Sequence, residues 1–122
     1  MILVDTSVWV DHLRSNEPAL AEALESGLVL AHPFLVGELA CGNLRNRAAV
    51  MVLLRSLPAA PAATDAEALA FIEGRSLMGR GIGYIDVHLL ASAALSHDTL
   101  LWTRDRRLAE IADTLHLAFH EE

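Results

Sequence analysis

Apolar residues along the chain fall into two patterns. Short continuous apolar runs at 2–4, 28–31 and 99–102 have the length of buried strands. Between them, apolar residues recur three and four positions apart, which predicts amphipathic helices. The predicted helices are one that carries Val8, Trp9 and Leu13, followed by 18–26, 33–44, 47–57, 64–78, 84–97 and 104–114.

Residues 58–63 are interpreted as a connection that can include a short strand, and residues 116–119 as a weak last strand. Strands that alternate with helices predict a parallel sheet covered on both faces. The expected fold class is therefore α/β, with three layers in the order α/β/α and a small parallel sheet of four to five strands. No internal repeat, low-complexity tract or long linker divides the chain, so residues 1–122 are expected to form one domain.

Helix boundaries carry signals of their own. Pro18 and Pro33 are placed as first-turn prolines, and Gly27 follows a helix as a C-terminal stop. Thr64 and Glu67 have the spacing of a capping box, which predicts a helix start there.

Composition adds limits on partners and compartment. Apolar residues make up 53% of the 122 residues, which excludes a disordered chain. The chain is also more apolar than a typical soluble domain, which favours a subunit or partner interface. The net charge of −7 argues against binding nucleic acid or an anionic membrane through bulk charge. A single cysteine forms no internal disulfide, and no run is long enough to span a membrane. A cytoplasmic location is therefore expected, with no membrane partner.

Four carboxylates stand where ligands bind in such folds. In an open parallel sheet, ligands bind beyond the carboxyl ends of the strands, where strand ends and helix starts meet. Asp5 ends the first strand, Asp86 opens the helix after a glycine-rich stretch, and Asp105 follows the 99–102 strand. Glu38 lies in an apolar helix, where an unpaired carboxylate on a core-facing stripe is costly.

Each of these acids also has an ordinary structural interpretation. Asp86 and Asp105 suit helix starts, where the helix dipole favours negative charge. Asp5 suits a cap for the helix that follows it. Glu38 fits a hydrogen-bonded surface acid.

If all four carboxylates lie close together, their mutual repulsion must be offset. Two unit charges about 6 Å apart repel by about 3 kcal/mol at an effective dielectric of about 20. Six such pairs would cost more than about 10 kcal/mol, which is comparable to a domain's stability of about 5–15 kcal/mol. Such a cluster must take up protons or a cation, and oxygen ligands favour Mg²⁺ or Mn²⁺. That ion can activate water against a phosphodiester, as in metal-dependent nucleases.

These segments resemble the PIN-domain ribonucleases, and more closely the VapC toxins of bacterial toxin–antitoxin pairs. The resemblance follows the order of the family along nearly the whole chain. The matching segments are ILVDTSVW at 2–9, GELACGNLRNR at 37–47, GRGIGYIDVHLLASA at 79–93 and LLWTRDRRL at 100–108.

The resemblance implies a PIN-like fold, Mg²⁺-dependent endonucleolytic cleavage of RNA, a homodimer and inhibition by a cognate VapB-like antitoxin. By position, Asp5 and Asp86 resemble the principal metal ligands. Glu38 and Asp105 complete the acidic site, directly or through water. Two hydroxyl residues flank the site and are expected to hydrogen-bond metal-held water or to cap helices; they are Thr6 and Thr103.

Arginines near the fourth acid are candidate phosphate contacts, because Arg binds phosphate with two parallel hydrogen bonds. They are Arg104, Arg106 and Arg107, for which salt-bridged surface is the alternative. The Gly79–Gly83 stretch lacks the spacing and Lys of a P-loop and is interpreted as a flexible lead into the Asp86 helix.

Other function classes fit less well. A receiver domain needs an active-site Lys, and all nine basic residues of this chain are Arg. A haloacid-dehalogenase-type phosphatase needs a second Asp where Ser7 stands. The remaining alternative is a catalytically silent PIN-like binding module that holds metal or antitoxin without turnover.

Overall fold

The first strand of the chain lies at the centre of the sheet. The computed structural model describes residues 1–121, and these form a parallel sheet in the order β2-β1-β3. Its strands are β1 (Ile2–Val4), β2 (Val29–Leu30) and β3 (Leu100–Trp102). Ile2 pairs with Val29 on one side and with Leu100 on the other. The carboxyl ends of all three strands therefore lie at the same edge.

The sheet is smaller than the expected four to five strands. In the described residues, the two weak candidates make only isolated bridges, one from Ala59 to Ala31 and one from Ala118 to Leu101. Pro58 and Pro61 bracket the first bridge, and proline has no N–H with which to continue a ladder. The second bridge comes just after His116, whose φ of 60° turns the chain out of extended geometry.

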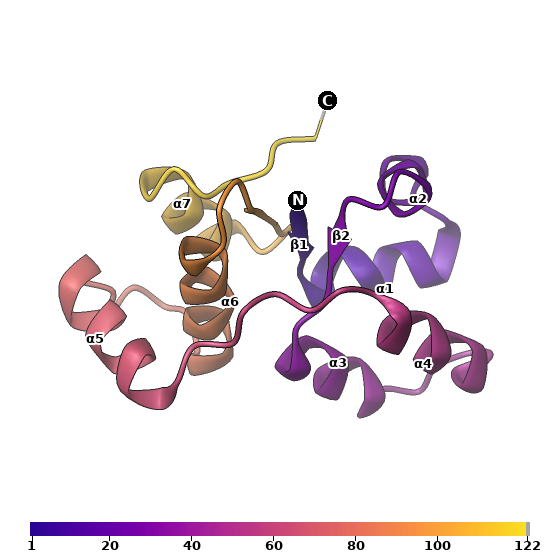
Figure 1. Cartoon of the computed structure of the whole chain (residues 1–122), viewed down its shortest axis with the longest axis horizontal. Coiled ribbons are helices and arrows are strands. Elements are labelled where there is room, and N and C mark those ends of the chain that lie inside the picture. The colour runs from indigo at the N-terminus through magenta and orange to yellow at the C-terminus, as the bar shows by residue number, and fades with distance from the viewer. Residues whose placement is uncertain (122) are drawn as a thin grey trace.

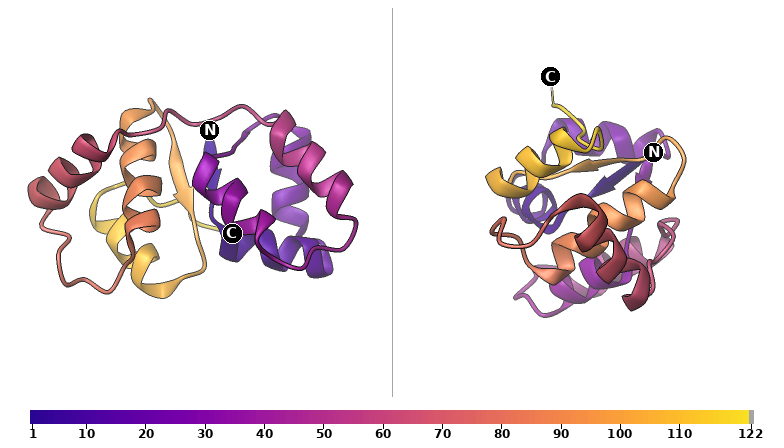
Figure 2. Two further views of the ribbon diagram at one scale, coloured as in Figure 1. Left: turned by 90° about the horizontal axis from the view of Figure 1, so that it is seen from below. Right: turned by 90° about the vertical axis from the view of Figure 1, so that its left-hand side faces the viewer.

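Helices cover both sides of this sheet. Figure 1 shows α5, α6 and α7 on one side of the strands and α1 to α4 on the other, and Figure 2 gives the same arrangement from below. This confirms the expected α/β class. The bounds are α1 (Thr6–Ser15), α2 (Pro18–Glu25), α3 (Pro33–Ala40), α4 (Arg47–Ser56), α5 (Asp65–Arg75), α6 (Tyr84–Leu95) and α7 (Arg106–Thr114).

Helix α3 ends four residues before its predicted end at residue 44. The guanidinium of Arg47 donates hydrogen bonds to the carbonyl oxygens of Ala40 at 2.6 Å and Gly42 at 3.2 Å. These carbonyls at the end of the helix would otherwise lack partners, so Arg47 stabilises the break. Residues 41–46 then form a separate connection to α4.

The hydrophobic core lies on both faces of the sheet. Trp9 of α1 and Trp102 of β3 are both almost fully buried. Seven consecutive residues of α6, Val87 to Ala93, are also buried, so this helix is enclosed nearly all round. The capping box of Thr64 and Glu67 is confirmed by both of its hydrogen bonds. Within residues 1–121, every helix is too short or too polar to cross a membrane.

Candidate active site

Asp5 sits at the carboxyl end of β1 and is only 6% exposed. Its backbone carbonyl accepts the first hydrogen bonds of α1, from Val8 and Trp9, but its carboxylate does not cap the helix. Instead, Oδ2 accepts a hydrogen bond from Ser7 Oγ and another from Thr103 Oγ1, both 2.8 Å long. The carboxylate is therefore fixed in direction while Oδ1 stays free of hydrogen bonds within residues 1–121.

Ser7 is a site residue that the sequence analysis did not single out. Besides donating to Asp5, its Oγ accepts a 3.0 Å hydrogen bond from the backbone N–H of Arg104. It thus ties the start of α1 to the turn between β3 and α7. The signal in the sequence is a hydroxyl residue two positions after a strand-end Asp, a spacing at which short polar side chains hydrogen-bond their neighbours.

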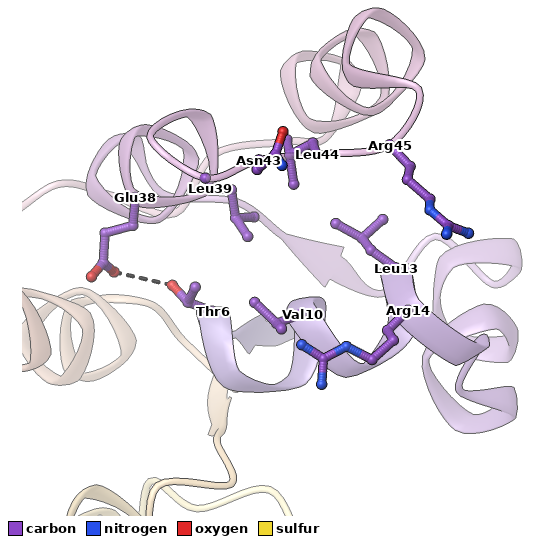
Figure 3. Close-up of a pocket in the computed structure, with 10 residues that line it drawn as sticks. Thr6, Val10, Leu13, Arg14, Glu38, Leu39, Asn43, Leu44 and Arg45 are labelled. Carbon is purple, nitrogen blue, oxygen red and sulfur yellow. Dashed lines mark hydrogen bonds between the residues drawn. The ribbon is translucent and has the colours of Figure 1, made fainter.

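Glu38 lies on α3 and faces Thr6 at the start of α1 (Figure 3). Thr6 Oγ1 donates a 3.0 Å hydrogen bond to Glu38 Oε1. The expectation that Glu38 lies on a core-facing stripe is wrong, because the residue is exposed while Leu35 and Leu39 face the core. The carboxylate therefore needs no buried counter-charge and is open to solvent at the mouth of the site.

Asp86 and Asp105 both cap helices. Asp86 is the third residue of α6, and its Oδ2 accepts a 3.2 Å hydrogen bond from the N–H of Gly83. Asp105 precedes α7, and its Oδ1 accepts a 3.0 Å hydrogen bond from the N–H of Leu108. The ordinary structural interpretation is thus correct for both acids. Each cap uses one carboxylate oxygen, which leaves the other for a ligand.

Three of the carboxylates act electrostatically on the fourth, that of Asp86. Burial is the largest cause that raises the pKa of Asp86 above its ordinary value, and the hydrogen bond from Gly83 opposes the rise. Three nearby negative charges raise this pKa further, those of Asp5, Asp105 and Glu38. Since Coulomb repulsion of this kind weakens with distance, the chain has brought its four candidate acids into one neighbourhood.

The same acids are not drawn together into a closed ligand cage. Among residues 1–121, no three His, Cys, Asp or Glu side chains are grouped closely enough to hold one ion in their present rotamers. The donor set still suits a hard divalent cation, because every donor is an oxygen and the repulsion around Asp86 is relieved by positive charge. Closing the site requires the carboxylates to turn toward a common point.

Arg104 differs from the expected phosphate contact. Its guanidinium binds three carboxylates, those of Asp11, Glu17 and Glu121, at 2.7 to 2.9 Å. Four of its five N–H bonds are used in this way. Arg104 therefore fastens the β3–α7 turn to α1 and to the C-terminal segment, and little of it is left to bind a substrate.

The other two arginines remain nearer to solvent. Arg106 is 92% exposed and lies 3.5 Å from Glu110, a weak helix-surface pair. Arg107 packs against the glycine-rich loop before α6, since a Cβ added at Gly81 would lie 2.6 Å from its Nη1. Gly81 also has a φ of 82°, so its backbone conformation favours glycine at this position.

Comparison with known proteins agrees with the resemblance seen in the sequence. The model of the PIN domain family matches residues 2–114. Ribonuclease VapC32 of Mycobacterium tuberculosis, from strain CDC 1551 / Oshkosh and from strain ATCC 25618 / H37Rv, is 43% identical over 122 residues. Each alignment covers 100% of this chain and 98% of the relative. The chain therefore belongs to the PIN-domain family, in which its full-length relatives are VapC ribonucleases.

Proposed function

We propose that this chain is an Mg²⁺-dependent endoribonuclease and the toxin of a VapBC-type toxin–antitoxin pair. The observation that carries the proposal is the placement of three acids just beyond strand ends and at helix starts, with Asp5 after β1, Asp86 in the first turn of α6 and Asp105 at the N-cap of α7. Full-length similarity to Ribonuclease VapC32 supports RNA as the substrate. We propose further that residues 1–122 act as one PIN domain.

Asp5 and Asp86 would be the principal ligands of Mg²⁺, with Mn²⁺ as a plausible substitute. Glu38 and Asp105 would complete the set directly or through water. When bound, the ion supplies positive charge to the phosphodiester and lowers the pKa of a water molecule. The support for this assignment is the all-oxygen donor set and one carboxylate oxygen on each Asp that lies outside the hydrogen bonds described above.

The chain's own residues supply orientation. Ser7 and Thr103 hold Asp5 Oδ2, which restrains the carboxylate and leaves Oδ1 available to a ligand. Thr6 holds Glu38 at the solvent-facing mouth, where this carboxylate can position the attacking water and accept its proton. Water attack at phosphorus then breaks the bond to one ester oxygen and separates the two RNA fragments.

Arg106 and Arg107 are the remaining candidates for phosphate contact near Asp105. Arg107 lies against Gly81, next to the loop that leads to Asp86. A guanidinium there would face a phosphate neighbouring the scissile one. Arg104 is assigned instead to holding the turn in place.

A cognate VapB-like antitoxin and a homodimer are the proposed protein partners, in the cytoplasm. The name of the M. tuberculosis relatives supports the antitoxin, and the apolar share of 53% supports an interface. Light scattering at micromolar concentration measures the dimer directly, and a monomer mass would contradict it.

The proposed activity is tested with the purified, antitoxin-free chain and a cellular RNA pool. Wild type should cleave RNA in Mg²⁺, and EDTA should abolish this cleavage. The Asp5→Asn variant should not cleave RNA in Mg²⁺. Glu73→Gln is the matched control, because it removes one exposed carboxylate from α5, away from the sheet edge. Equal cleavage by wild type and Asp5→Asn would contradict the mechanism. A folded, metal-loaded wild type that cuts nothing would favour the silent binding module.

A further inference from the structure

Helix α3, which carries Glu38, is held at both of its ends by side chains. It spans only the eight residues Pro33–Ala40, and an isolated helix of this length is marginal in water. At its start, Nδ1 of His32 accepts a 3.0 Å hydrogen bond from the backbone N–H of Phe34. At its end, the guanidinium of Arg47 binds carbonyl oxygens, as described above. The position of Glu38 therefore depends on both contacts.

The cap at the start of α3 sets the protonation state of His32. Because Nδ1 accepts a hydrogen bond, the neutral ring carries its proton on Nε2. The residue is only 1% exposed, and its Nε2 is buried without a hydrogen-bond partner among residues 1–121. A second proton would sit on Nδ1 and face the N–H of Phe34, so that two donors would meet. The cap therefore exists only while His32 is neutral.

The groups around His32 do not stabilise a positive charge on it. Within the described part of the chain, no carboxylate lies within 4.0 Å of its ring nitrogens. From α6, the buried ring of His88 lies at a centroid distance of 6.4 Å. His88 in turn contacts Tyr84 of α6 and lies 3.6 Å from Asp65 of α5. Residues 58–63, which bridge to the residue before His32, carry no titratable side chain, and neither do β1 and β2.

These surroundings keep the ring of His32 neutral. Burial is the largest cause that lowers the pKa of His32 below its ordinary value of 6.5, and the charge of His88 lowers this pKa further. Glu38 on the same helix and Asp86 on α6 are not among its causes. Burial disfavours the charged form of a histidine, so the capping form is the stable one at neutral pH.

We propose that His32 is a positioning residue for Glu38 and makes the candidate active site sensitive to acid. While His32 is neutral, it holds the start of α3. When it is protonated, the start of α3 loosens and Glu38 leaves its place beside Thr6. The inference rests on the proposed function, in which Glu38 positions the attacking water. His32 acts through α3 and does not touch the substrate.

The effect of pH has a defined direction. Because the pKa of His32 is lowered in the folded state, the unfolded chain binds this proton more tightly. The stability that neutral His32 contributes is complete above the ordinary pKa of 6.5 and is lost as pH falls through the lowered one. Asp86 has a raised pKa and acts in the opposite direction, so its protonation adds stability as pH falls. A loss of order in acid is therefore not explained by Asp86.

Two substitutions separate the cap from the charge. His32→Asn keeps a hydrogen-bond acceptor at the start of α3, because Asn is a favoured N-cap residue, and it has no proton to gain. His32→Ala removes both the acceptor and the titratable group. His97→Asn is the matched control, since it removes an exposed histidine beyond the end of α6. Circular dichroism checks that each full-length variant is folded.

The first measurement needs only the wild-type chain. Nuclear magnetic resonance follows the titration of the His32 ring, and hydrogen exchange follows the protection of the α3 amides over the same pH range. As His32 gains its proton, protection of α3 should fall by about tenfold or more relative to that of α6. His32→Asn should keep its α3 protection, His97→Asn should follow wild type, and His32→Ala should show low protection at every pH. Unchanged α3 protection through the titration of His32 in wild type would overturn the proposal.

The second measurement is the pH profile of RNA cleavage in saturating Mg²⁺. The rate of wild type divided by that of His32→Asn should be constant above pH 6.5 and fall by about threefold or more once His32 is protonated. Carboxylates that hold the metal titrate alike in both proteins and cancel in this ratio. A ratio that stays constant through the titration of His32 would overturn the proposal. If the proposed function itself fails, wild type cleaves no RNA at any pH, and hydrogen exchange still decides whether His32 holds α3.

Discussion

Thr103 Oγ1, at the end of β3, donates a 2.8 Å hydrogen bond to Oδ2 of Asp5 at the end of β1. Thr103 Oγ1 also accepts a 3.1 Å hydrogen bond from the backbone N–H of Asp105. One hydroxyl therefore links the carboxylate of Asp5 to the backbone of Asp105, just beyond the ends of the neighbouring parallel strands β1 and β3. Its position follows directly from the pairing of β1 with β3.

Replacing this hydroxyl should slow cleavage more than it destabilises the fold. Thr103→Val keeps the shape of the side chain but removes both hydrogen bonds, so Asp5 loses one of its two orienting partners. We expect cleavage to slow by about tenfold, equivalent to about 1.4 kcal/mol. Thr103→Ser should restore most of the rate. Measured rates for Thr103→Val equal to wild type would show that this hydroxyl does not orient the site.

Arg104 should contribute to stability through its three carboxylates. Arg104→Met keeps the aliphatic stem and leaves three acids without their cation, so we expect a loss of about 1–2 kcal/mol in the free energy of unfolding. Urea unfolding measures this change. Arg106→Met is the control, because that guanidinium is 92% exposed and should change stability by less than about 0.5 kcal/mol.

The contribution of Arg104 should depend on pH in the acid range. Its hydrogen bond is the largest cause that lowers the pKa of Glu121 below the ordinary value of 4.5. A lowered pKa in the folded state adds stability that is complete above the ordinary pKa and lost as pH falls through the lowered one. The difference in unfolding free energy between wild type and Arg104→Met should therefore shrink below pH 4.5. A difference that stays constant to pH 2 would exclude this linkage.

The glycine loop before α6 should respond unequally to alanine. Gly81→Ala meets a φ of 82°, while the exposed Arg107 side chain can move aside, so it should lose about 1–2 kcal/mol. Gly79→Ala has a φ of 70° and open space, so it should lose about 1 kcal/mol. Gly83→Ala has neither problem and should be close to neutral. Thermal unfolding ranks the three, and a Gly83→Ala variant less stable than Gly81→Ala would contradict this order.

Asp86 should reduce the stability of the metal-free protein. Its raised pKa means that the folded state binds this proton more tightly than the unfolded state does. Stability due to this group therefore falls as pH rises from the ordinary pKa of 3.8 through the raised one, and stays lowered above it.

Asp86→Asn should then be more stable than wild type at neutral pH in EDTA, by less than about 1 kcal/mol because partial exposure screens the repulsion. The two proteins should converge below pH 3.8. Mg²⁺ should stabilise wild type and leave Asp86→Asn unchanged, since only a binding-competent folded state gains from the ion. Denaturation curves with and without Mg²⁺ decide this, and equal stabilisation of both proteins would count against Asp86 as a ligand.

Much of the framework could be predicted from local sequence signals. The apolar runs located the strands, and Pro18, Pro33 and the Thr64–Glu67 capping box marked three helix starts. These features depend on neighbouring residues only. Residues 58–63 and 116–119 form single bridges and not strands, because pairing at the side of a sheet depends on a partner far away in the chain. Prolines also interrupt the first of these segments.

The candidate acids could be named from the sequence, but the residues that hold the site in place could not. Asp5, Asp86 and Asp105 follow from their places at strand ends and helix starts. The roles of Ser7, Arg47 and Arg104 depend on partners on other elements or across a loop. Glu38 shows a related error, since apolar neighbours in sequence did not reveal which side of α3 faces solvent.

The central claim is that four carboxylates at the edge of the sheet form one divalent-cation site. Titration of Mn²⁺ into the antitoxin-free chain, followed by the electron paramagnetic resonance signal of free Mn²⁺, tests it directly. Wild type and Glu73→Gln should bind Mn²⁺ in competition with Mg²⁺, and Asp5→Asn and Asp86→Asn should each bind at least about tenfold more weakly. Wild-type affinity in both Asp variants, or no binding by folded wild type, would contradict the account.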